Sequence, residues 1–428
     1  MGILTTNYLT RGFWGDESWT ALISELPIKE IIRVTGEDFH PPLYYFIVHA
    51  WGNLFSFDEV TIRLISVIFH ILTPVAAFSL SKFFLKNSLH RLSFSLLVLI
   101  SPILFTYAFE ARTYALLTFL TALSTLSFWK GREEKGYSWR IIYSLTGAVM
   151  VYDHYYAWFI LASHGLYLLF FEIKKLKKLL LPALAILFAQ LPWLPTLFSQ
   201  VGSVNNSYWI GAISNRTHLE FFVRVAGGDT TSTAQVLVSI LLGTLMFFGL
   251  IYRIIKHKLD RPYLFLLIWL IIPTLLPTLI SIFFFPVFFY RYLIFSSLPI
   301  LLLTLDAVSH INKYMAYTLL SLIVYFYITN DYLIFSKSTY SVREERLKVL
   351  DLVEPGTTLY TVLPSFAEVM YYLSDDYNVL VSPEGLIQFS GKSLLDAYVR
   401  LGYTEIVEPS GDYWIIKPGP ETSHFSGE

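Results

Sequence analysis

The stretch TIRLISVIFHILTPVAAFSLSKFFLKNSLHR, residues 61–91, decides the class of this protein. It begins with an apolar run at about 62–81 and continues into a loop that carries Lys82, Lys86 and Arg91. An apolar run of about 20 residues can cross the hydrocarbon core of a bilayer as a helix. A basic loop directly after such a run predicts that this end of the helix faces the cytoplasm. We therefore expect a membrane helix whose C-terminal end lies inside.

The same pattern recurs along most of the chain. Of the 428 residues, 55% are hydrophobic and only 15% are charged, whereas soluble domains carry about 25% charged residues. Ten candidate spans follow, at about 62–81, 92–109, 113–129, 139–153, 155–171, 179–198, 234–252, 262–285, 288–305 and 314–333. The chain has no cysteine, which excludes disulfides and cysteine-ligated metals. No basic block suggests that the chain binds nucleic acid. We predict a mainly α-helical, polytopic membrane bundle of about ten spans.

The loops between these spans differ in charge. One set holds 16 lysines and arginines and the other set holds six, so the first set is predicted to be cytoplasmic. Residues 1–61 then form an outer loop, the bundle covers 62–335, and the tail also falls outside. This orientation requires that PPLYYFIVHAWGNLF, residues 41–55, does not span. We expect it to form a juxtamembrane helix on the outer surface.

The tail, residues 336–428, changes character. Helical patterns at 343–353, 365–373 and 393–402 alternate with strand patterns at 357–363, 378–382, 403–409 and 412–418. Such alternation predicts a small extracytoplasmic α/β domain. No glycine-rich phosphate loop follows a strand, so we assign the tail no chemistry.

An acid pair stands near the start of the chain, in RGFWGDESWT at residues 11–20. Asp16 and Glu17 could be two solvated carboxylates on an outer loop. Alternatively, they are a general base and an orienting partner. Aromatic packing by Phe13, Trp14 and Trp19 would desolvate the pair and raise the pKa of one member, which suits a base that works near neutral pH.

Two further polar motifs fall on the outer side. In EDFHPPLYY, residues 37–45, two prolines stiffen the chain after His40. They form either a stiff turn that starts the surface helix or a rigid platform that presents Asp38 and His40 to the carboxylates. In FEARTY, residues 109–114, Glu110 and Arg112 lie between two spans. They form a local pair or supply a second acid to the same cavity.

Two more candidates lie close to bilayer boundaries. His154, next to Asp153 in DHYYAWF, reads as a boundary histidine or as a metal ligand, so a divalent metal ion is left open. Arg291 lies in FFYRYLIF, inside an apolar span. An arginine in a membrane segment is costly and is functional by default, and its forked donors match the phosphate of a lipid carrier.

Acids for base chemistry, an arginine for phosphate and aromatic platforms for sugar rings indicate glycosyl transfer outside the membrane. The motifs also occur in a familiar order. GDESWT, HPPLYYFIVHAWGNLF, TIRLISVIFH and SPILFTYAFEARTYALLTFL, with HYYAWF, QLPWLP and RYLIFSSLP, resemble the GT-C glycosyltransferases. The resemblance spans about residues 10 to 305 and is greatest to the protein O-mannosyltransferase and aminoarabinose-transferase group, glycosyltransferase family 39.

The resemblance implies a multi-helix membrane fold and an inverting transfer from a polyprenyl-phosphate sugar, such as dolichyl phosphate mannose. It implies that Asp16 is the catalytic base and that Glu110 occupies the place of a second family acid. It makes His40, Arg112 and Arg291 candidates for binding the donor phosphate, and it matches His154 to a family histidine. Some relatives bind a divalent ion and others need none, so metal dependence stays open.

One departure concerns the start of the chain. In the family, a membrane helix precedes the acid pair, whereas only 15 residues precede Asp16 here, so we expect that a helix is missing in front of it. The oligosaccharyltransferase motif WWDYG is also absent from the sequence.

The leading hypothesis is a hexosyl- or pentosyltransferase in the plasma membrane. It would use a polyprenyl-phosphate sugar and act on a protein, lipid or glycan acceptor of the cell envelope. A transporter or flippase of a lipid-linked sugar is the first alternative, although it predicts internal symmetry and charges at mid-membrane. A non-catalytic partner subunit is the second alternative.

Overall fold

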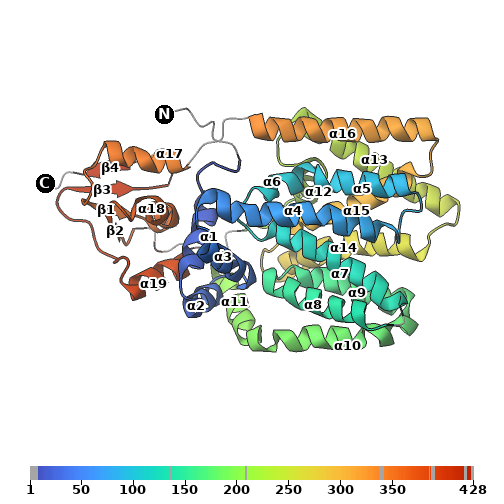
Figure 1. The fold of residues 1–428 in the computed structure, drawn as a ribbon, viewed down its shortest axis with the longest axis horizontal. Coiled ribbons are helices and arrows are strands. Elements are labelled where there is room, and N and C mark those ends of the chain that lie inside the picture. The colour runs from blue at the N-terminus through green and yellow to red at the C-terminus, as the bar shows by residue number, and fades with distance from the viewer. Residues whose placement is uncertain are drawn as a thin grey trace.

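The computed structural model describes residues 8–134, 136–207, 210–336, 342–384, 386, 391–418 and 422–425. A helical bundle occupies one end of the long axis and a small α/β domain occupies the other, with three N-terminal helices between them (Figure 1). These three helices are α1 (Gly15–Glu25), α2 (Ile28–Glu37) and α3 (Leu43–Leu54). At 12 residues, α3 is too short to cross a bilayer, in agreement with its expected place beside the membrane.

The bundle follows from the apolar runs. Its helices are α4 (Glu59–Ser81), α5 (Ser88–Leu99), α6 (Pro102–Ala108), α7 (Tyr114–Glu133), α8 (Ser138–Asp153), α9 (Ala157–Phe171), α10 (Ile173–Gln190), α11 (Leu194–Ser207), α12 (Thr217–Gly227), α13 (Thr233–Ile255), α14 (Arg261–Phe283), α15 (Ser297–Val308) and α16 (Lys313–Ser336). Two 3-10 turns, η1 (Leu191–Trp193) and η2 (Tyr290–Ser296), lead into α11 and α15. Side-chain caps mark several helix starts: Asp58 caps α4 and Asp260 caps α14 by accepting backbone N–H bonds.

All ten expected spans coincide with helices. Among the described residues, six helical segments are long and apolar enough to cross a membrane, or seven if the bent pair α5–α6 counts as one. The other three expected spans are α7, α8 and α9, of 20, 16 and 15 residues. Most of α7 is buried, and the helix packs against α4 and α8. Its serines and threonines suit this position, because small side chains let neighbouring membrane helices approach closely. The chain is a multi-pass membrane protein.

The tail forms a small mixed sheet with helices on it. Its elements are α17 (Val342–Leu347), η3 (Lys348–Asp351), β1 (Thr358–Thr361), η4 (Leu363–Ser365), α18 (Phe366–Leu373), β2 (Asn378–Val381), α19 (Lys392–Leu401), β3 (Tyr413–Ile416) and β4 (Thr422–Phe425). The strand order is β2-β1-β3-β4, with β1 parallel to both neighbours and β4 antiparallel to β3. The strand expected at 403–409 is reduced to a single bridge between Ile406 and Val381, and β4 was not expected.

The N-terminal helices share a hydrophobic core with the tail. Trp19 and Ile23 of α1 lie in one buried cluster with Val369 of α18 and Leu395 of α19. Helix α1 packs on α18, and α2 packs on α19. The tail therefore covers α1 on the side away from the bundle and fixes the position of the acid pair between the two parts (Figure 1).

Candidate active site

The two carboxylates of the acid pair lie in different environments. Successive residues of a helix point about 100° apart, so α1 turns Asp16 and Glu17 in different directions. Glu17 is fully buried. Its Oε1 accepts hydrogen bonds from Arg63 Nε at 2.8 Å and from the Ala111 N–H at 2.8 Å, and its Oε2 accepts from Arg63 Nη2 at 2.6 Å. Glu17 thus joins α1 to α4 and to the segment before α7.

Arg63, which sequence reasoning missed, completes this connection. Its Nη1 also donates to the carbonyls of Leu9 at 2.9 Å and Arg11 at 2.5 Å, so it holds the chain that leads into α1. The signal was present in TIRLISVIFH, where a lone arginine opens an apolar span. A buried arginine in such a place requires a partner, and Glu17 is that partner.

Asp16 faces a polar cavity of about 490 Å³. Its side chain is 42% exposed, and its Oδ2 lies 3.9 Å from Arg112 Nη2 and 3.7 Å from Arg291 Nη1. The cavity is lined by Trp14, Gly15, Asp16, Trp19, Asp38, Phe39, His40, Arg112, Phe289, Arg291, Tyr292, Leu363, Pro364, Ala367, Glu368 and Gly391. Both ion-pair distances exceed a normal hydrogen bond. The carboxylate is therefore placed between two cations but remains open to the cavity.

The two arginines keep unused donors. Arg112 Nη1 makes only long contacts, at 3.4 Å, to the Asp16 carbonyl and to Thr20 Oγ1. The guanidinium of Arg291 lies over the rings of Trp14 and Phe289, at 5.3 and 5.4 Å from the centroids. In the described part of the chain, neither arginine has a partner for its buried Nε. Forked donors with spare capacity suit a phosphate group.

His40 is held between Asp38 and Arg112. Arg112 Nη2 lies 3.4 Å from His40 Nε2, and Asp38 Oδ2 lies 3.4 Å from His40 Nδ1. Because a guanidinium can only donate, Nε2 is the acceptor and Nδ1 carries the proton toward the carboxylate. The prolines at 41 and 42 start α3 directly after this residue. The platform that the sequence predicted therefore presents Asp38 and His40 to the polar cavity.

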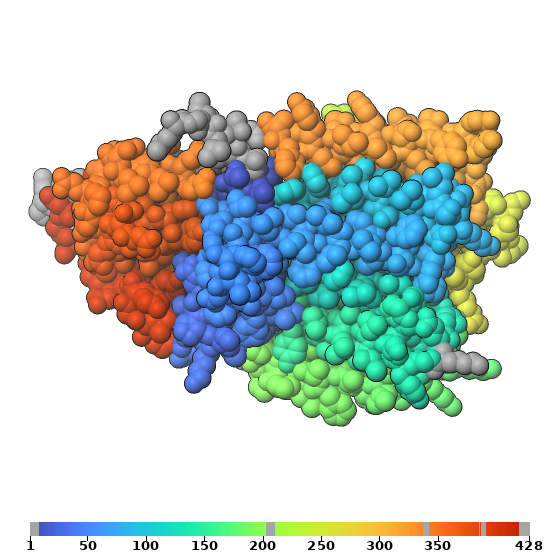
Figure 2. Space-filling model, in the orientation of Figure 1, coloured from blue at the N-terminus to red at the C-terminus, as the bar shows by residue number. Residues whose placement is uncertain are grey.

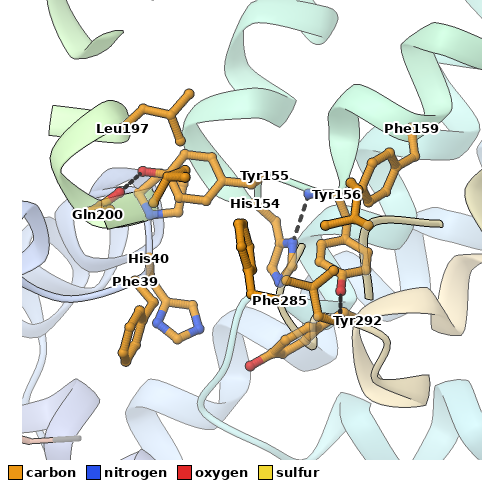
Figure 3. Close-up of a pocket in the computed structure, with 14 residues that line it drawn as sticks. Phe39, His40, His154, Tyr155, Tyr156, Phe159, Leu197, Gln200, Phe285 and Tyr292 are labelled. Atoms are coloured by element: carbon orange, nitrogen blue, oxygen red, sulfur yellow. Dashed lines mark hydrogen bonds between the residues drawn. The ribbon is translucent and has the colours of Figure 1, made fainter. Parts of the chain in front are cut away.

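His154 lies near His40, with the ring centroids 6.3 Å apart, and both line the wall of a second cavity (Figure 3). Its Nδ1 accepts a hydrogen bond from the Tyr156 N–H at 3.2 Å. Burial, and then the proximity of His40 and Arg112, holds the pKa of His154 well below its ordinary value. His154 is thus a neutral imidazole at neutral pH.

This second cavity is apolar, with a volume of about 180 Å³. Its walls are Phe39, His40, Pro41, His154, Tyr155, Tyr156, Phe159, Leu197, Gln200, Val201, Ile280, Phe285, Val287 and Tyr292. Two tyrosine hydroxyls of this wall are engaged in hydrogen bonds: Tyr155 donates to Gln200, and Tyr156 donates to the Val287 carbonyl (Figure 3). Phe39, His40 and Tyr292 line both cavities, so the polar cavity adjoins the apolar one.

Glu110 lies in the segment between α6 and α7, outside the polar cavity of Asp16. It lines a further cavity of about 310 Å³ with Arg11, Gly12, Trp14, Arg291 and Val342. Burial raises the pKa of Glu110 to about 7, against the opposing effect of Arg291. Its Oε2 is buried without a partner among the described residues. A single proton at Glu110 therefore changes the charge beside Arg291 near neutral pH.

The tail contributes residues that sequence reasoning left out. Pro364, Ala367 and Glu368 close the polar cavity from the side of the α/β domain. Glu368 Oε2 is paired with Arg346 Nη2 at 2.8 Å. The signal for these residues is weak, because their place depends on how the tail docks on α1.

Metal binding is not indicated by the side chains described. In those residues, no group of three or more histidine, aspartate or glutamate side chains is arranged to hold a metal ion. Asp153, the neighbour of His154, instead accepts a hydrogen bond from the hydroxyl of Thr113.

The sequence and fold resemble known membrane glycosyltransferases. The model of the family described as dolichyl-phosphate-mannose-protein mannosyltransferase matches residues 39–197. ArnT from Cupriavidus metallidurans, in the apo state and bound to undecaprenyl phosphate, aligns with a TM-score of 0.66 at 12% identity, covering 96% of this chain and 90% of that chain. The Archaeoglobus fulgidus oligosaccharyltransferase, in complex with Zn and sulfate, aligns with a TM-score of 0.53 at 12% identity, covering 86% and 58%. No curated protein sequence matches this chain.

These findings confirm the resemblance to the GT-C glycosyltransferases that the sequence motifs indicated. The expected fold, a membrane helix bundle with a small α/β domain, is that of ArnT. The match to the mannosyltransferase family model also agrees with the interpretation of a membrane glycosyltransferase.

Proposed function

We propose that this protein is an inverting hexosyl- or pentosyltransferase that moves a sugar from a polyprenyl phosphate to an acceptor hydroxyl. The observation that carries the proposal is the position of Asp16, an accessible carboxylate between two arginines with spare donors, in a polar cavity that adjoins an apolar one. A base, a phosphate site and a lipid site are the three parts that such a reaction needs.

Asp16 acts as the general base. Its carboxylate takes the proton of the acceptor hydroxyl while the hydroxyl oxygen forms a bond to C1 of the sugar. The bond between C1 and the phosphate oxygen breaks, and the polyprenyl phosphate leaves with the electron pair. Because the acceptor attacks opposite the leaving group, the anomeric centre is inverted. A carboxylate that is 42% exposed can reach a hydroxyl in the cavity without first breaking a hydrogen-bonded ion pair.

Arg112 and Arg291 stabilise the phosphate. The charge on the leaving oxygen grows as the C1–O bond breaks, and fixed cations next to it lower the energy of that state. Their long contacts to Asp16, at 3.9 and 3.7 Å, leave the donors free to turn to a phosphate. His40, oriented by Asp38, lies beside Arg112 and positions the same group.

The apolar cavity holds the first part of the polyprenyl chain. Its wall of aromatic and aliphatic side chains begins where the polar cavity ends, at Phe39, His40 and Tyr292. Neutral His154 fits this surface because a charged imidazole next to an isoprenoid would lose solvation. Glu17 serves as a positioning residue, since its buried pair with Arg63 holds α1 and therefore Asp16.

The charge of the loops supports a reaction on the extracytoplasmic side of the plasma membrane. Lysines and arginines concentrate in the loops at the end of the bundle away from Asp16. The acceptor, a protein, lipid or glycan of the cell envelope, would then enter between the bundle and the α/β domain.

Replacement of the base tests the proposal. In Asp16→Asn we expect the release of polyprenyl phosphate from a panel of polyprenyl-phosphate sugars, with cell-envelope material as acceptor, to fall about 10³-fold. Affinity for polyprenyl phosphate itself should change little. Glu405→Gln, at an exposed acid of the tail, is the matched control and should retain full activity. Unchanged turnover in Asp16→Asn would falsify the mechanism.

A further inference from the structure

A separate cavity of about 550 Å³ opens at the end of the bundle away from the α/β domain. It lies among the loop after α4, the turn between α13 and α14, and the end of α15, at the right of Figure 1. Its walls are Phe84, Leu85, Lys86, Asn87, His90, Arg253, His257, Lys258, Leu259, Asp260, Asp306, Ser309 and His310. None of these residues lines the cavities around Asp16.

The two acids of this cavity are already engaged. Asp306 accepts from Arg253 Nε at 2.7 Å and from Arg253 Nη2 at 2.5 Å, and His310 Nε2 lies 3.7 Å from it. Asp260 lies 3.3 Å from Arg253 Nη1 and accepts from the Tyr263 N–H at 3.0 Å, at the positive end of α14. Among the described residues, neither carboxylate forms an ion pair with Lys86 or Lys258.

Four basic side chains remain at the cavity. Lys86 and Lys258 are exposed, and neither has an ion-pair partner within the described ranges. His90 and His257 lie at the same opening. The positive-inside rule accounts for basic residues on this side of a membrane protein. It does not account for their convergence, from loops far apart in the sequence, around one concave surface.

The turn after α13 has an unusual backbone. His257 adopts a φ of 51°, in the left-handed region that glycine occupies at least cost. The turn is closed by bonds from the Lys258 N–H to the Arg253 carbonyl at 2.8 Å and from the His257 N–H to the Ile254 carbonyl at 3.1 Å, which is the Schellman pattern. Arg253 Nη1 also donates to the Lys258 carbonyl at 2.7 Å. A large basic side chain is therefore held where a glycine would be favoured, and such a site is a candidate for function.

Apolar surface lies next to the charged rim. Leu89 and Leu92 of α5 are 42% and 48% exposed, and Ile254 and Ile255 of α13 are 47% and 67% exposed. On a membrane protein such side chains face lipid. A ligand at this cavity thus meets basic groups at one end and apolar helix surfaces at the other, which is the chemistry of a phospholipid.

We propose that this cavity binds the phosphate group of an anionic lipid through Lys86, Lys258, His90 and His257, at the face opposite the candidate active site. The site is independent of the sugar transfer, since it shares no residue with the cavities around Asp16. Charge-assisted bonds from Lys86 and Lys258, with hydrogen bonds from the two histidines, select an anionic head group over a zwitterionic one.

Binding of short-chain lipids by the full chain in detergent tests this site. The probes are dihexanoyl phosphatidylglycerol, dihexanoyl phosphatidylcholine and inorganic phosphate. We expect the double variant Lys86→Gln/Lys258→Gln to weaken phosphatidylglycerol binding about tenfold. The matched control Lys174→Gln/Lys177→Gln removes the same charge from exposed positions of α10, outside the cavity, and should bind like the unmodified protein.

Three results would overturn the proposal. Equal weakening of binding in both double variants would mean that only general surface charge matters. Equal affinity for phosphatidylcholine and phosphatidylglycerol would mean that the site does not select an anionic head group, and inorganic phosphate that binds as tightly as phosphatidylglycerol would mean a site for free phosphate. A further variant separates ligand binding from folding. His257→Gly should raise the unfolding midpoint, because glycine suits the left-handed turn, and should also weaken phosphatidylglycerol binding. Tighter or unchanged binding in His257→Gly contradicts the assignment.

Discussion

The polar and the apolar cavity share a wall but are built in opposite ways. The polar cavity, of about 490 Å³, collects Asp16, Arg112 and Arg291 from three distant segments of the chain. The apolar cavity, of about 180 Å³, has the hydroxyls of Tyr155 and Tyr156 in bonds with protein groups and is lined mostly by carbon atoms (Figure 3). The polar cavity leaves the Nε donors of Arg112 and Arg291 without a partner among the described residues, whereas the apolar cavity engages two of its tyrosine hydroxyls in hydrogen bonds. Unsatisfied donors mark where a charged ligand part belongs, and a satisfied wall marks where an apolar part belongs.

The largest expected effect is on the free energy of unfolding and concerns Glu110, which lines a cavity together with Arg291. Its raised pKa, about 7, means that the folded protein holds a proton that the unfolded chain releases near pH 4.5. The free energy of unfolding that this proton contributes is fully present below about pH 4.5 and is lost as the pH rises through 7. Measured against Glu110→Gln, which does not titrate, the loss should be about 3 kcal/mol. Equilibrium unfolding of both proteins in detergent across this pH range measures the difference. A difference that does not change with pH would mean that Glu110 is not buried beside Arg291 as described.

A smaller effect is expected from Arg291→Gln. Loss of one charged donor to a phosphate should weaken binding of polyprenyl phosphate about 30-fold. Arg216→Gln removes the same charge from an exposed position outside both cavities and is the control. Binding is measured directly with the purified protein. Equal affinity of the two variants would break the assignment of phosphate to the polar cavity.

The smallest effect is expected on the apolar side. Val201 of α11 lines the apolar cavity. Val201→Trp fills part of that cavity with a large ring and should weaken polyprenyl phosphate binding about tenfold, because the isoprenoid chain loses the apolar contact area that it would bury there. Competition by inorganic phosphate should be unaffected, since this ligand needs only the polar cavity. Leu184→Trp, on the exposed face of α10, is the control. If Val201→Trp weakens inorganic phosphate as well, the two cavities do not divide the ligand between them.

Much of the fold could be read from periodicity and composition. Each apolar run became a helix, and the short run at 41–55 stayed outside the set of membrane-capable helices, as α3. The tail pattern predicted β1, α18, β2, α19 and β3. These elements depend on local apolar spacing, which a sequence carries directly. The strand at 403–409 was wrong because strand pairing depends on a partner from elsewhere in the chain.

The candidate site was only partly predictable. His40, Glu110, Arg112, His154 and Arg291 had been predicted to lie on one face. In the structure, His40, Arg112 and Arg291 line the polar cavity of Asp16, Glu110 lines a further cavity that also contains Arg291, and His154 lines the apolar cavity. Glu17 had been paired with Asp16 as a catalytic residue, but its carboxylate is enclosed by Arg63 and the Ala111 N–H. The rotation of α1 about its axis decides which of two adjacent acids meets the cavity, and that rotation depends on packing against α4 and α18.

For this protein, the sequence by itself determined the membrane class, the positions of the helices and the chemical types available for a site, and it predicted the sidedness of the loops, since these follow from apolar run length, residue chemistry and charge bias. The tertiary structure alone decided that Asp16 is open while Glu17 is buried, that Arg63 supports the site, that tail residues such as Glu368 close it, and that a basic cavity exists at the other end. Those features join residues from distant segments, and only three-dimensional packing sets their distances.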